Sequence, residues 1–403
     1  MPGSNRALVD SKRFHDQNRA VISPALERSL PLLRCPVTRE PLTLLEPEEL
    51  AVMNRALAAG EWRHRDGSNV AEPLSLALGT ADRRLVYRIE DEIIWLLADM
   101  AILPAAEVAG SDLPPEKRVV RAFYDDFGWA KSEDGVFNDT KAFTEVGSQA
   151  RGYRRKCNTR IGRWLSGGAV LLDVASGAIP HPEYLDYSNG YETRICMDFC
   201  VRALREARQK LGDKGLYVIG DITRLPLANG AVDAVISLHT IYHVPQPEQT
   251  AAVDELVRVT RPGGRVVIAY LWGYSWAMNT VFRVRGWLGW LRRMGRPSPV
   301  AAEAAAARDT GMPDLYFHPQ NYDWFAREVA PRHDARLRVW SAVSTAFQNR
   351  FFVPGFAGRL ILRLVLAFES LLPWLAGRVG QYPLFVINVK AGRAFCDEKD
   401  KSR

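Results

Sequence analysis

Carboxylates and small residues occur where three short apolar runs end in the middle of the chain. They are Asp173 in the run 170–174, Asp198 at the end of 194–198, and Asp221 after 216–220. Because parallel strands end at one edge of a sheet, these side chains are expected to lie close together. A carboxylate at the end of a second strand suits a ribose diol, and the small residues 175–178 allow a ligand to approach the backbone.

Groups that can accept a proton follow the fourth apolar run, residues 231–238. They are His239, Tyr242 and His243. Histidine changes its charge near neutral pH, so it is the side chain most often used for proton transfer. The same edge of the sheet is therefore predicted to carry a base.

Five strands and the helices between them must position these residues. The patterns predict strands at 170–174, 194–198, 216–220, 231–238 and 265–270, with helices at 201–211 and 248–259. Strands that alternate with helices are typical of an α/β fold with a parallel sheet, whose site lies at the carboxyl ends of the strands.

Four segments in order resemble the class I S-adenosylmethionine-dependent methyltransferases, above all the branch with the quinone-biosynthesis C-methyltransferases. They are LLDVASGA, MDF, GDITRLPLANGAVDAVISLHTIYHVP and ELVRVTRPGGRVVIAY, and the resemblance covers about Phe123 to Trp272. It implies a Rossmann-like sheet of seven strands in which residues 381–390 form part of an antiparallel last pair.

The resemblance also implies the cofactor, S-adenosyl-L-methionine, and the residues that hold it. Asp173 and Gly177 would line its methionine end, and Asp198 would bind the ribose hydroxyls. Asp221 would accept a hydrogen bond from the adenine amino group, and Ile222 would pack on the ring. The expected cofactor-binding set is completed by Ala175, Ser176, Phe199 and Leu238.

The glycine-rich turn departs from the family pattern. Ala175 and Ile179 stand at two of the three usual glycine positions, which leaves Gly177. Because alanine resists a positive φ, the turn either keeps its special geometry at Gly177 or has another shape. A dinucleotide-binding dehydrogenase is the nearest other fold, but it requires G-x-G-x-x-G after the first strand, and that motif is absent.

Methyl transfer from a sulfonium is an in-line displacement, so alignment and exclusion of water are the main tasks of the protein. An acceptor hydroxyl also needs a base. His243 is the first candidate, because the loop after the fourth strand faces the transferable methyl in the resembled fold. His239 and Tyr242 are the other catalytic candidates, and His181 and His318 rank behind them. Packing of His243 is an equally good explanation for its presence.

Length and composition place this site in a chain of two or three domains. The chain has 403 residues, 47% of them hydrophobic, and a net charge of +7. We expect an arm at 1–29, a small module at 30–110, a methyltransferase domain at 111–393 and a polar tail at 394–403. Substrate-side insertions are expected at about 273–335 and 345–380. The first 20 residues lack the apolar run of a signal peptide, which favours a cytoplasmic protein.

The module at 30–110 is similar to a small zinc-ribbon-like family that partners or precedes methyltransferases. The similarity rests on the knuckle-like Cys35-Pro36 and the run 85–97. Cys35 alone remains of the four ligands, and a structural zinc needs four donors, so we expect a module without metal.

Two other stretches bear on the acceptor. Residues 256–302 contain arginines but no acid, which suits an anionic partner. In 350–380, a row of apolar residues falls at helical spacing, with Arg359 and Arg363 expected on the opposite side: Leu360, Leu364, Phe368, Leu371 and Leu375. The run is too interrupted for a membrane span. A core or lid helix is expected, and a peripheral contact with the inner face of the membrane is the alternative.

The sequence therefore predicts a methyltransferase that acts on a bulky, partly apolar small molecule, such as a lipid, a lipid-linked sugar or a natural-product intermediate. A tRNA, rRNA or protein methyltransferase is one alternative, but the chain has neither an N-P-P-Y-type loop after the fourth strand nor a recognisable RNA-binding module. A catalytically idle binding or scaffold protein is the other.

Overall fold

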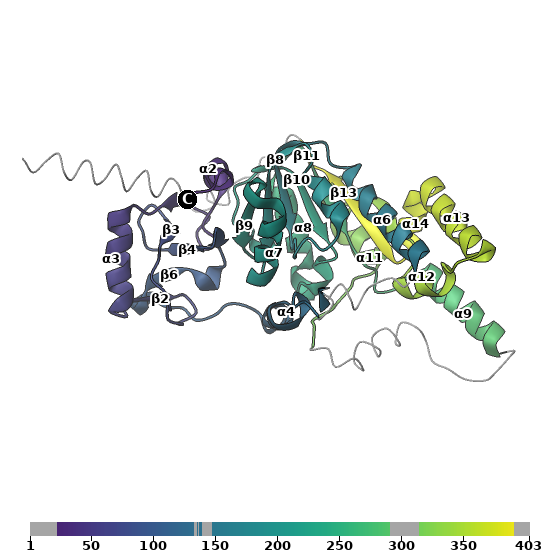
Figure 1. Ribbon diagram of the computed structural model, residues 1–403, viewed down its shortest axis with the longest axis horizontal. Helices are drawn as coiled ribbons and strands as arrows, with labels where there is room; N and C mark the ends of the chain where they lie inside the picture. The colour runs from purple at the N-terminus through teal and green to yellow at the C-terminus, as the bar shows by residue number, and fades with distance from the viewer. Residues whose placement is uncertain (1–21, 133–134, 136, 139–146, 291–313, 391–403) are drawn as a thin grey trace, which may run out of the picture.

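A sheet of seven strands forms the centre of the larger part of the molecule (Figure 1). The computed structural model describes residues 22–132, 135, 137, 138, 147–290 and 314–390. The strands are β7 (Gly168–Val174), β8 (Tyr191–Asp198), β9 (Gly215–Ile219), β10 (Val232–Leu238), β11 (Thr260–Ala269), β12 (Ala335–Ser341) and β13 (Tyr382–Asn388). Their order is β9-β8-β7-β10-β11-β13-β12, and β13 runs antiparallel to both of its neighbours. The predicted Rossmann-like α/β sheet is confirmed.

Helices cover both faces of this sheet, which is why its central strands read as continuous apolar runs. On one face lie α6 (Ser148–Gly162), α7 (Val201–Leu211) and α14 (Pro373–Val379), with α12 (Thr345–Phe351) beside them. On the other lie α2 (Pro24–Ser29), α8 (Gln249–Val259), α11 (Tyr322–Trp324) and the π-helical turn η10 (Phe325–Val329). The parallel strands are thus buried between two layers of helices.

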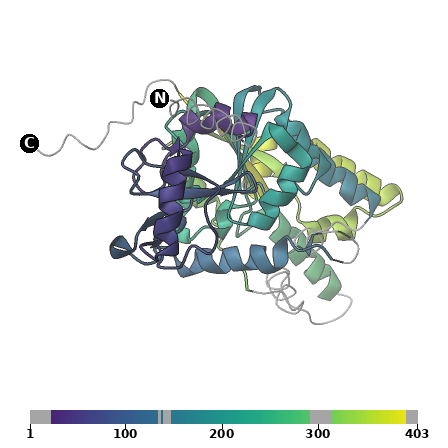
Figure 2. The ribbon, with the colours of Figure 1, turned by 60° about the vertical axis from the view of Figure 1, so that its left-hand side comes forward.

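The N-terminal module extends the same sheet. It contains β1 (Thr43–Leu44), α3 (Pro47–Ala58), β2 (Trp62–His64), β3 (Leu76–Gly79), β4 (Val86–Glu90), β5 (Ile93–Trp95) and β6 (Ile102–Pro104). Strand β5 pairs in parallel with β9, and the Leu96 amide donates to the Ile219 carbonyl at 2.8 Å. Figures 1 and 2 show the module beside this edge of the sheet. The two parts therefore share one sheet of 13 strands.

Cys35 stands in a tight turn at the start of the module. Its amide donates to the Glu40 carbonyl at 2.9 Å, the Thr38 amide donates to its Sγ at 3.3 Å, and the Tyr87 hydroxyl lies 3.1 Å from the same sulfur. Within the described ranges, no group of three or more His, Cys, Asp or Glu side chains is placed to hold a metal ion. The absence of zinc from this module stays a prediction.

Helices near the C-terminus depart from the expected arrangement. α13 (Phe356–Leu371) packs on the core through Ile361, Leu362 and Val365, while Leu360 and Leu364 are 44% and 61% exposed. Of the two expected kinds of helix, a core helix is therefore wrong, because α13 lies on the surface with Leu360 and Leu364 toward solvent. Arg359 and Arg363 are exposed as well, so they share the solvent side of the helix with these two leucines.

No single helix of the described chain is long and apolar enough to cross a membrane. α13 and α14 pass that test only together, by length and composition, and they are bent by 111° relative to each other. Most of the N-terminal arm, the polar tail and part of the expected insertion at about 273–335 lie outside the described residues.

Candidate active site

The turn after β7 places three residues in the left-handed region of backbone space. The φ angles of Ala175, Gly177 and Ile179 are 56°, 55° and 50°. A left-handed conformation costs a residue with a Cβ about 1–2 kcal/mol. The turn therefore keeps its special geometry at all three positions, although only one is glycine. At Gly177 a side chain is also excluded by space, because an added Cβ would lie 2.3 Å from Cζ2 of Trp129.

Asp198 binds this turn directly. The Gly177 amide donates to its Oδ2 at 2.9 Å and the Cys200 amide to its Oδ1 at 2.9 Å. The carboxylate is 9% exposed, and burial raises its pKa to about 6 against the opposing effect of these two amides. The structure thus brings Gly177 and Asp198 together, and each Asp198 oxygen keeps a lone pair for a second donor.

Asp221, at the tip of β9, holds a buried lysine. Its Oδ1 accepts from the Thr223 amide at 2.9 Å and its Oδ2 from Nζ of Lys117 at 2.7 Å. Nζ of Lys117 also lies 2.6 Å from Glu248, and Lys117 is only 5% exposed. Sequence reasoning missed Lys117, since one lysine in an amphipathic helix is usually solvated. Ile222, the next residue after Asp221, is buried.

Asp173 forms a buried ion pair and, unlike Asp198, makes no hydrogen bond to the turn among the residues that the structure describes. Its Oδ2 accepts from Nε and Nη2 of Arg194, and the two side chains are 4% and 0% exposed. Nη1 of Arg194 donates to the Tyr184 carbonyl at 2.6 Å and to Ser188 Oγ at 3.1 Å. Asp173 thus carries a buried ion pair that joins β7 to β8.

A continuous segment, Pro115–Trp129, lies across the tips of β7, β8 and β9. It consists of α4 (Pro115–Phe123), the π-helical turn η4 (Tyr124–Gly128) and Trp129. Lys117 reaches Asp221, the Tyr124 carbonyl accepts from Cys200 Sγ at 3.5 Å, and Trp129 lies against Gly177. We call Pro115–Trp129 the cover segment, because it contacts residues at all three of these strand tips.

His239 follows β10 in a strained and partly buried position. Its φ is 60°, and its Nε2 is buried without a hydrogen-bond partner in the part of the chain that the structure describes. The ring lies 4.4 Å from the Trp340 ring and 5.7 Å from that of Tyr382. Burial, with the nearby Arg154 as the next cause, lowers the pKa of His239 to about 3. An unpartnered buried nitrogen in a strained residue is a common mark of a ligand site.

His243 has a defined tautomer. Its Nδ1 lies 2.8 Å from the Tyr316 carbonyl, which can only accept, so Nδ1 carries the hydrogen and Nε2 has the free lone pair. Burial lowers its pKa to about 4. Its ring lies 4.6 Å from the Tyr242 ring and 6.3 Å from that of Tyr124 in the cover segment. At neutral pH His243 is therefore an uncharged proton acceptor among aromatic rings.

These residues fit the adenosine half of a cofactor best. Asp198 supplies a carboxylate at the tip of β8, Asp221 one at the tip of β9, and Phe199 and Leu238 are partly exposed beside them. Ser176 is held by its amide, which donates to the Met197 carbonyl at 3.2 Å. A methionine end that approaches Gly177 meets the Trp129 indole first. Trp129 of the cover segment therefore lies where the expected methionine end would approach the turn.

Comparison with known proteins agrees with this geometry. Residues 172–268 match a family model described as a methyltransferase domain. A demethylmenaquinone methyltransferase from Renibacterium salmoninarum is 31% identical over 161 residues, which are 40% of this chain and 61% of that protein. One from Mycobacterium sp. (strain JLS) is 35% identical over 120 residues, 30% of this chain and 48% of that protein. The chain thus spans about half the length of these relatives.

Solved structures with a similar chain path have low sequence identity. A phosphoethanolamine N-methyltransferase from Haemonchus contortus gives a TM-score of 0.42 at 14% identity and covers 72% of this chain and 62% of its own. Geranyl diphosphate C-methyltransferase from Streptomyces coelicolor A3(2) gives 0.41 at 12% identity, with 69% and 99% covered.

The order of the strands, the carboxylates at their tips and the matched family model lead to one conclusion. Residues 172–268 match a methyltransferase domain, the sheet around them has the Rossmann-like class I fold, and S-adenosylmethionine is the cofactor of this kind of domain.

Proposed function

We propose that the chain transfers the methyl group of S-adenosylmethionine to a bulky, partly apolar small molecule of the quinol type. The observation that carries the proposal is the pair of uncharged histidines at the tip of β10, enclosed by aromatic rings. His239 has an unpartnered Nε2 beside Trp340, and His243 has a free Nε2 lone pair beside Tyr242. The curated relatives named as demethylmenaquinone methyltransferases support the choice of a quinol.

The residues at this tip can prepare such an acceptor for attack. Nε2 of His243 or His239 takes the proton from a ring hydroxyl, which increases the electron density on the ring carbons. Arg154 stabilises the resulting negative charge, because it lies near His239, with its guanidinium 4.8 Å from the Trp340 ring. The aromatic walls exclude water and orient the ring. The cofactor would supply the methyl group as an electrophile, with the S–CH3 bond breaking to leave a neutral thioether, and the methylated ring carbon would then lose its proton to solvent.

A labelling experiment tests the acceptor class. The protein is incubated with cofactor carrying a labelled methyl group and a cell extract, which is then separated into lipid, RNA, protein and small-molecule pools. We expect label in the lipid or apolar small-molecule pool, followed by turnover of a purified demethylated quinol. Label in RNA or protein alone would show that the acceptor is a macromolecule.

Variants of the histidines test the mechanism. His239→Ala and His243→Ala are expected to lower kcat, at least one of them by about 100-fold, the usual contribution of a general base. His333→Ala is the matched control, because His333 binds Asp254 away from β10. If both variants turn over like the unchanged protein, neither histidine is the base. Calorimetry with the cofactor tests the alternative of a catalytically idle protein, because the absence of measurable binding would favour that alternative.

A further inference from the structure

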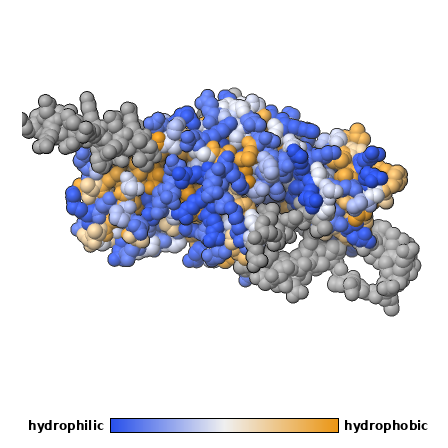
Figure 3. All heavy atoms as spheres, in the orientation of Figure 1, coloured by the Kyte–Doolittle hydropathy of each residue, from blue (hydrophilic) through white to orange (hydrophobic). Residues whose placement is uncertain are grey.

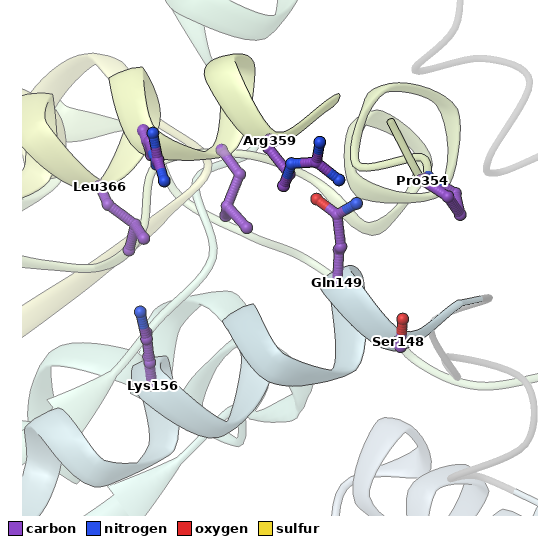
Figure 4. Close-up of a pocket in the computed structure, with 8 residues that line it drawn as sticks. Ser148, Gln149, Lys156, Pro354, Arg359 and Leu366 are labelled. Carbon is purple, nitrogen blue, oxygen red and sulfur yellow. The ribbon is translucent and has the colours of Figure 1, made fainter. Parts of the chain in front are cut away.

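A groove with basic and apolar walls lies between α6 and α13, on the outside of the domain. Figure 4 shows Lys156 on α6 facing Arg359 and Leu366 on α13 across it. Its volume is about 540 Å³, and its walls also include Leu362 and Arg363. The groove is separate from the strand tips described above, because none of its lining residues belongs to the loops after β7, β8, β9 or β10.

Among the described residues, no acid pairs with the positive charges of this groove. Lys156, Arg359 and Arg363 form no ion pair with any carboxylate in the described ranges. Glu369 is the one acid on α13, and it is fully buried, where it binds Arg160 at 2.6 Å and the Ala342 amide at 2.7 Å. The outer face of α13 therefore presents positive charge alone.

Large apolar side chains lie beside these cations on the same helix. Phe356, Leu360, Leu364 and Leu371 are 76%, 44%, 61% and 79% exposed. Their spacing of four, four and seven residues places them on one face, which we call the leucine face. Figure 3 shows hydrophobic atoms interrupted by hydrophilic ones at the end of the molecule that α13 forms. Exposed apolar patches of this kind usually mark an interaction site.

We propose that α13 docks this domain on the surface of an anionic phospholipid bilayer. The leucine face enters the interface between headgroups and acyl chains, and Lys156, Arg359 and Arg363 bind headgroup phosphates in and beside the groove. The contact is with one leaflet only. α14 cannot follow α13 into the bilayer, because it packs on β12 and its Gly377 carbonyl accepts from Trp272 Nε1 at 2.8 Å.

Charge argues against two other ways to cover this surface, a second copy of the chain and residues 291–313 of the same chain. A second copy of the chain would bring the same arginines to the contact, and like charges repel there. Residues 291–313 contain four arginines and two acids, so their net charge has the same sign as the groove: Arg292, Arg293, Arg296, Arg308, Glu303 and Asp309. A bilayer with anionic headgroups complements both the apolar and the basic part of the surface.

Sedimentation with vesicles tests the proposal on the full chain without cofactor, so the result does not depend on the proposed methyl transfer. Vesicles of phosphatidylcholine alone are compared with vesicles containing equal amounts of phosphatidylglycerol. We expect binding to the anionic vesicles, weaker binding as salt rises, and little binding to phosphatidylcholine alone. Equal binding to both kinds of vesicle, or binding to neither, would overturn the proposal.

Two double variants separate the basic from the apolar contribution. R359Q with R363Q is expected to weaken partition to anionic vesicles about 30-fold, since each basic residue at such a surface contributes about fivefold. L360S with L364S is also expected to weaken partition to the anionic vesicles, because the apolar side chains no longer enter the bilayer. The matched controls lie on α3 at the other end of the molecule, where Arg55 and Val52 are exposed. R55Q and V52S are expected to bind like the unchanged protein.

The same variants exclude an interface between copies. All four substituted side chains of α13 are exposed, so thermal unfolding should match that of the unchanged protein. If the unchanged protein is a dimer and L360S with L364S is a monomer, a second copy covers the leucine face and the proposal is wrong. It is also wrong if either double variant binds anionic vesicles like the unchanged protein.

Discussion

Ala175 has a backbone conformation that is unfavourable for alanine. It occupies a left-handed conformation, at φ 56°, in a turn where glycine would be unstrained. We predict that Ala175→Gly raises the free energy of unfolding by up to about 1 kcal/mol, because relief of strain exceeds the entropy that glycine adds to the unfolded chain. Urea unfolding measures the change.

Ala178 provides the control for this substitution. It is fully buried in the same turn, but its φ is not positive. Ala178→Gly should therefore lower stability, because glycine gains nothing there and a buried methyl group is lost. A loss of stability in Ala175→Gly as large as in Ala178→Gly would show that the strain argument is wrong.

Asp198 sets a pH limit on cofactor binding. Its pKa is raised by burial to about 6, and only the ionised carboxylate accepts hydrogen bonds from a diol through both oxygens. Protonation increases as pH falls through this value, so cofactor affinity is expected to be constant above about pH 7. Below pH 6 it should fall by up to about tenfold per pH unit. Calorimetric titration between pH 7.5 and 5 measures it.

Substitution identifies the titrating group. Asp198→Asn is expected to bind the cofactor more weakly at neutral pH and with little dependence on pH between 7.5 and 5. Asp213→Asn, at an exposed aspartate after α7, should retain the pH profile of the unchanged protein. A steep loss of affinity below pH 6 that persists in Asp198→Asn would assign the titration to another residue.

The cover segment shows what an element adds to the strand tips. Its Lys117 is nearly buried and neutralises Asp221 and Glu248, with Nζ at 2.7 and 2.6 Å from their oxygens. We predict that Lys117→Met lowers the free energy of unfolding by about 3 kcal/mol, because it leaves two partly buried carboxylates without their cation. Urea unfolding at neutral pH gives the value.

Lys131 offers a matched comparison, since it binds Glu206 at 2.7 Å but is 45% exposed. Ion pairs in solvent contribute little, so Lys131→Met should cost less than about 1 kcal/mol. Equal effects of the two substitutions would mean that burial does not strengthen the Lys117 cluster.

At the scale of the whole molecule, the N-terminal module completes the sheet. β5 covers the edge of β9, and Leu33, Tyr87 and Ile94 share one apolar core with Leu216 and Val218. We predict that deletion of residues 1–112 makes the remaining chain aggregate, because it exposes an unpaired strand edge and part of the core. Solubility and size-exclusion chromatography of the two forms measure this.

Deletion of residues 1–21 is the control for truncation, because it leaves β5 and the shared core in place. This shorter deletion should remain soluble and unfold like the complete chain. A soluble monomer after deletion of 1–112, with unchanged thermal unfolding, would show that the methyltransferase domain is stable without the module.

The central sheet could be predicted from the amino-acid sequence. Apolar runs that end in Asp198 and Asp221 can be buried only between layers of helices, so local pattern and chain order were enough to predict a parallel sheet with its carboxylates at one edge. Residues 381–390 were likewise recognisable as a strand, and β13 lies within that range. Such strands can be predicted from sequence because most residues along a strand that is buried on both faces are apolar.

Tertiary structure alone decided which partner each polar side chain has. Asp173 pairs with Arg194, and Lys117 crosses to Asp221 from an element about 100 residues earlier in the chain. It also decided that Leu364 faces solvent, since a row of apolar residues has the same spacing whether a helix is buried or on the surface. Spacing specifies a face of a helix or strand, but what covers that face depends on contacts between distant parts of the chain.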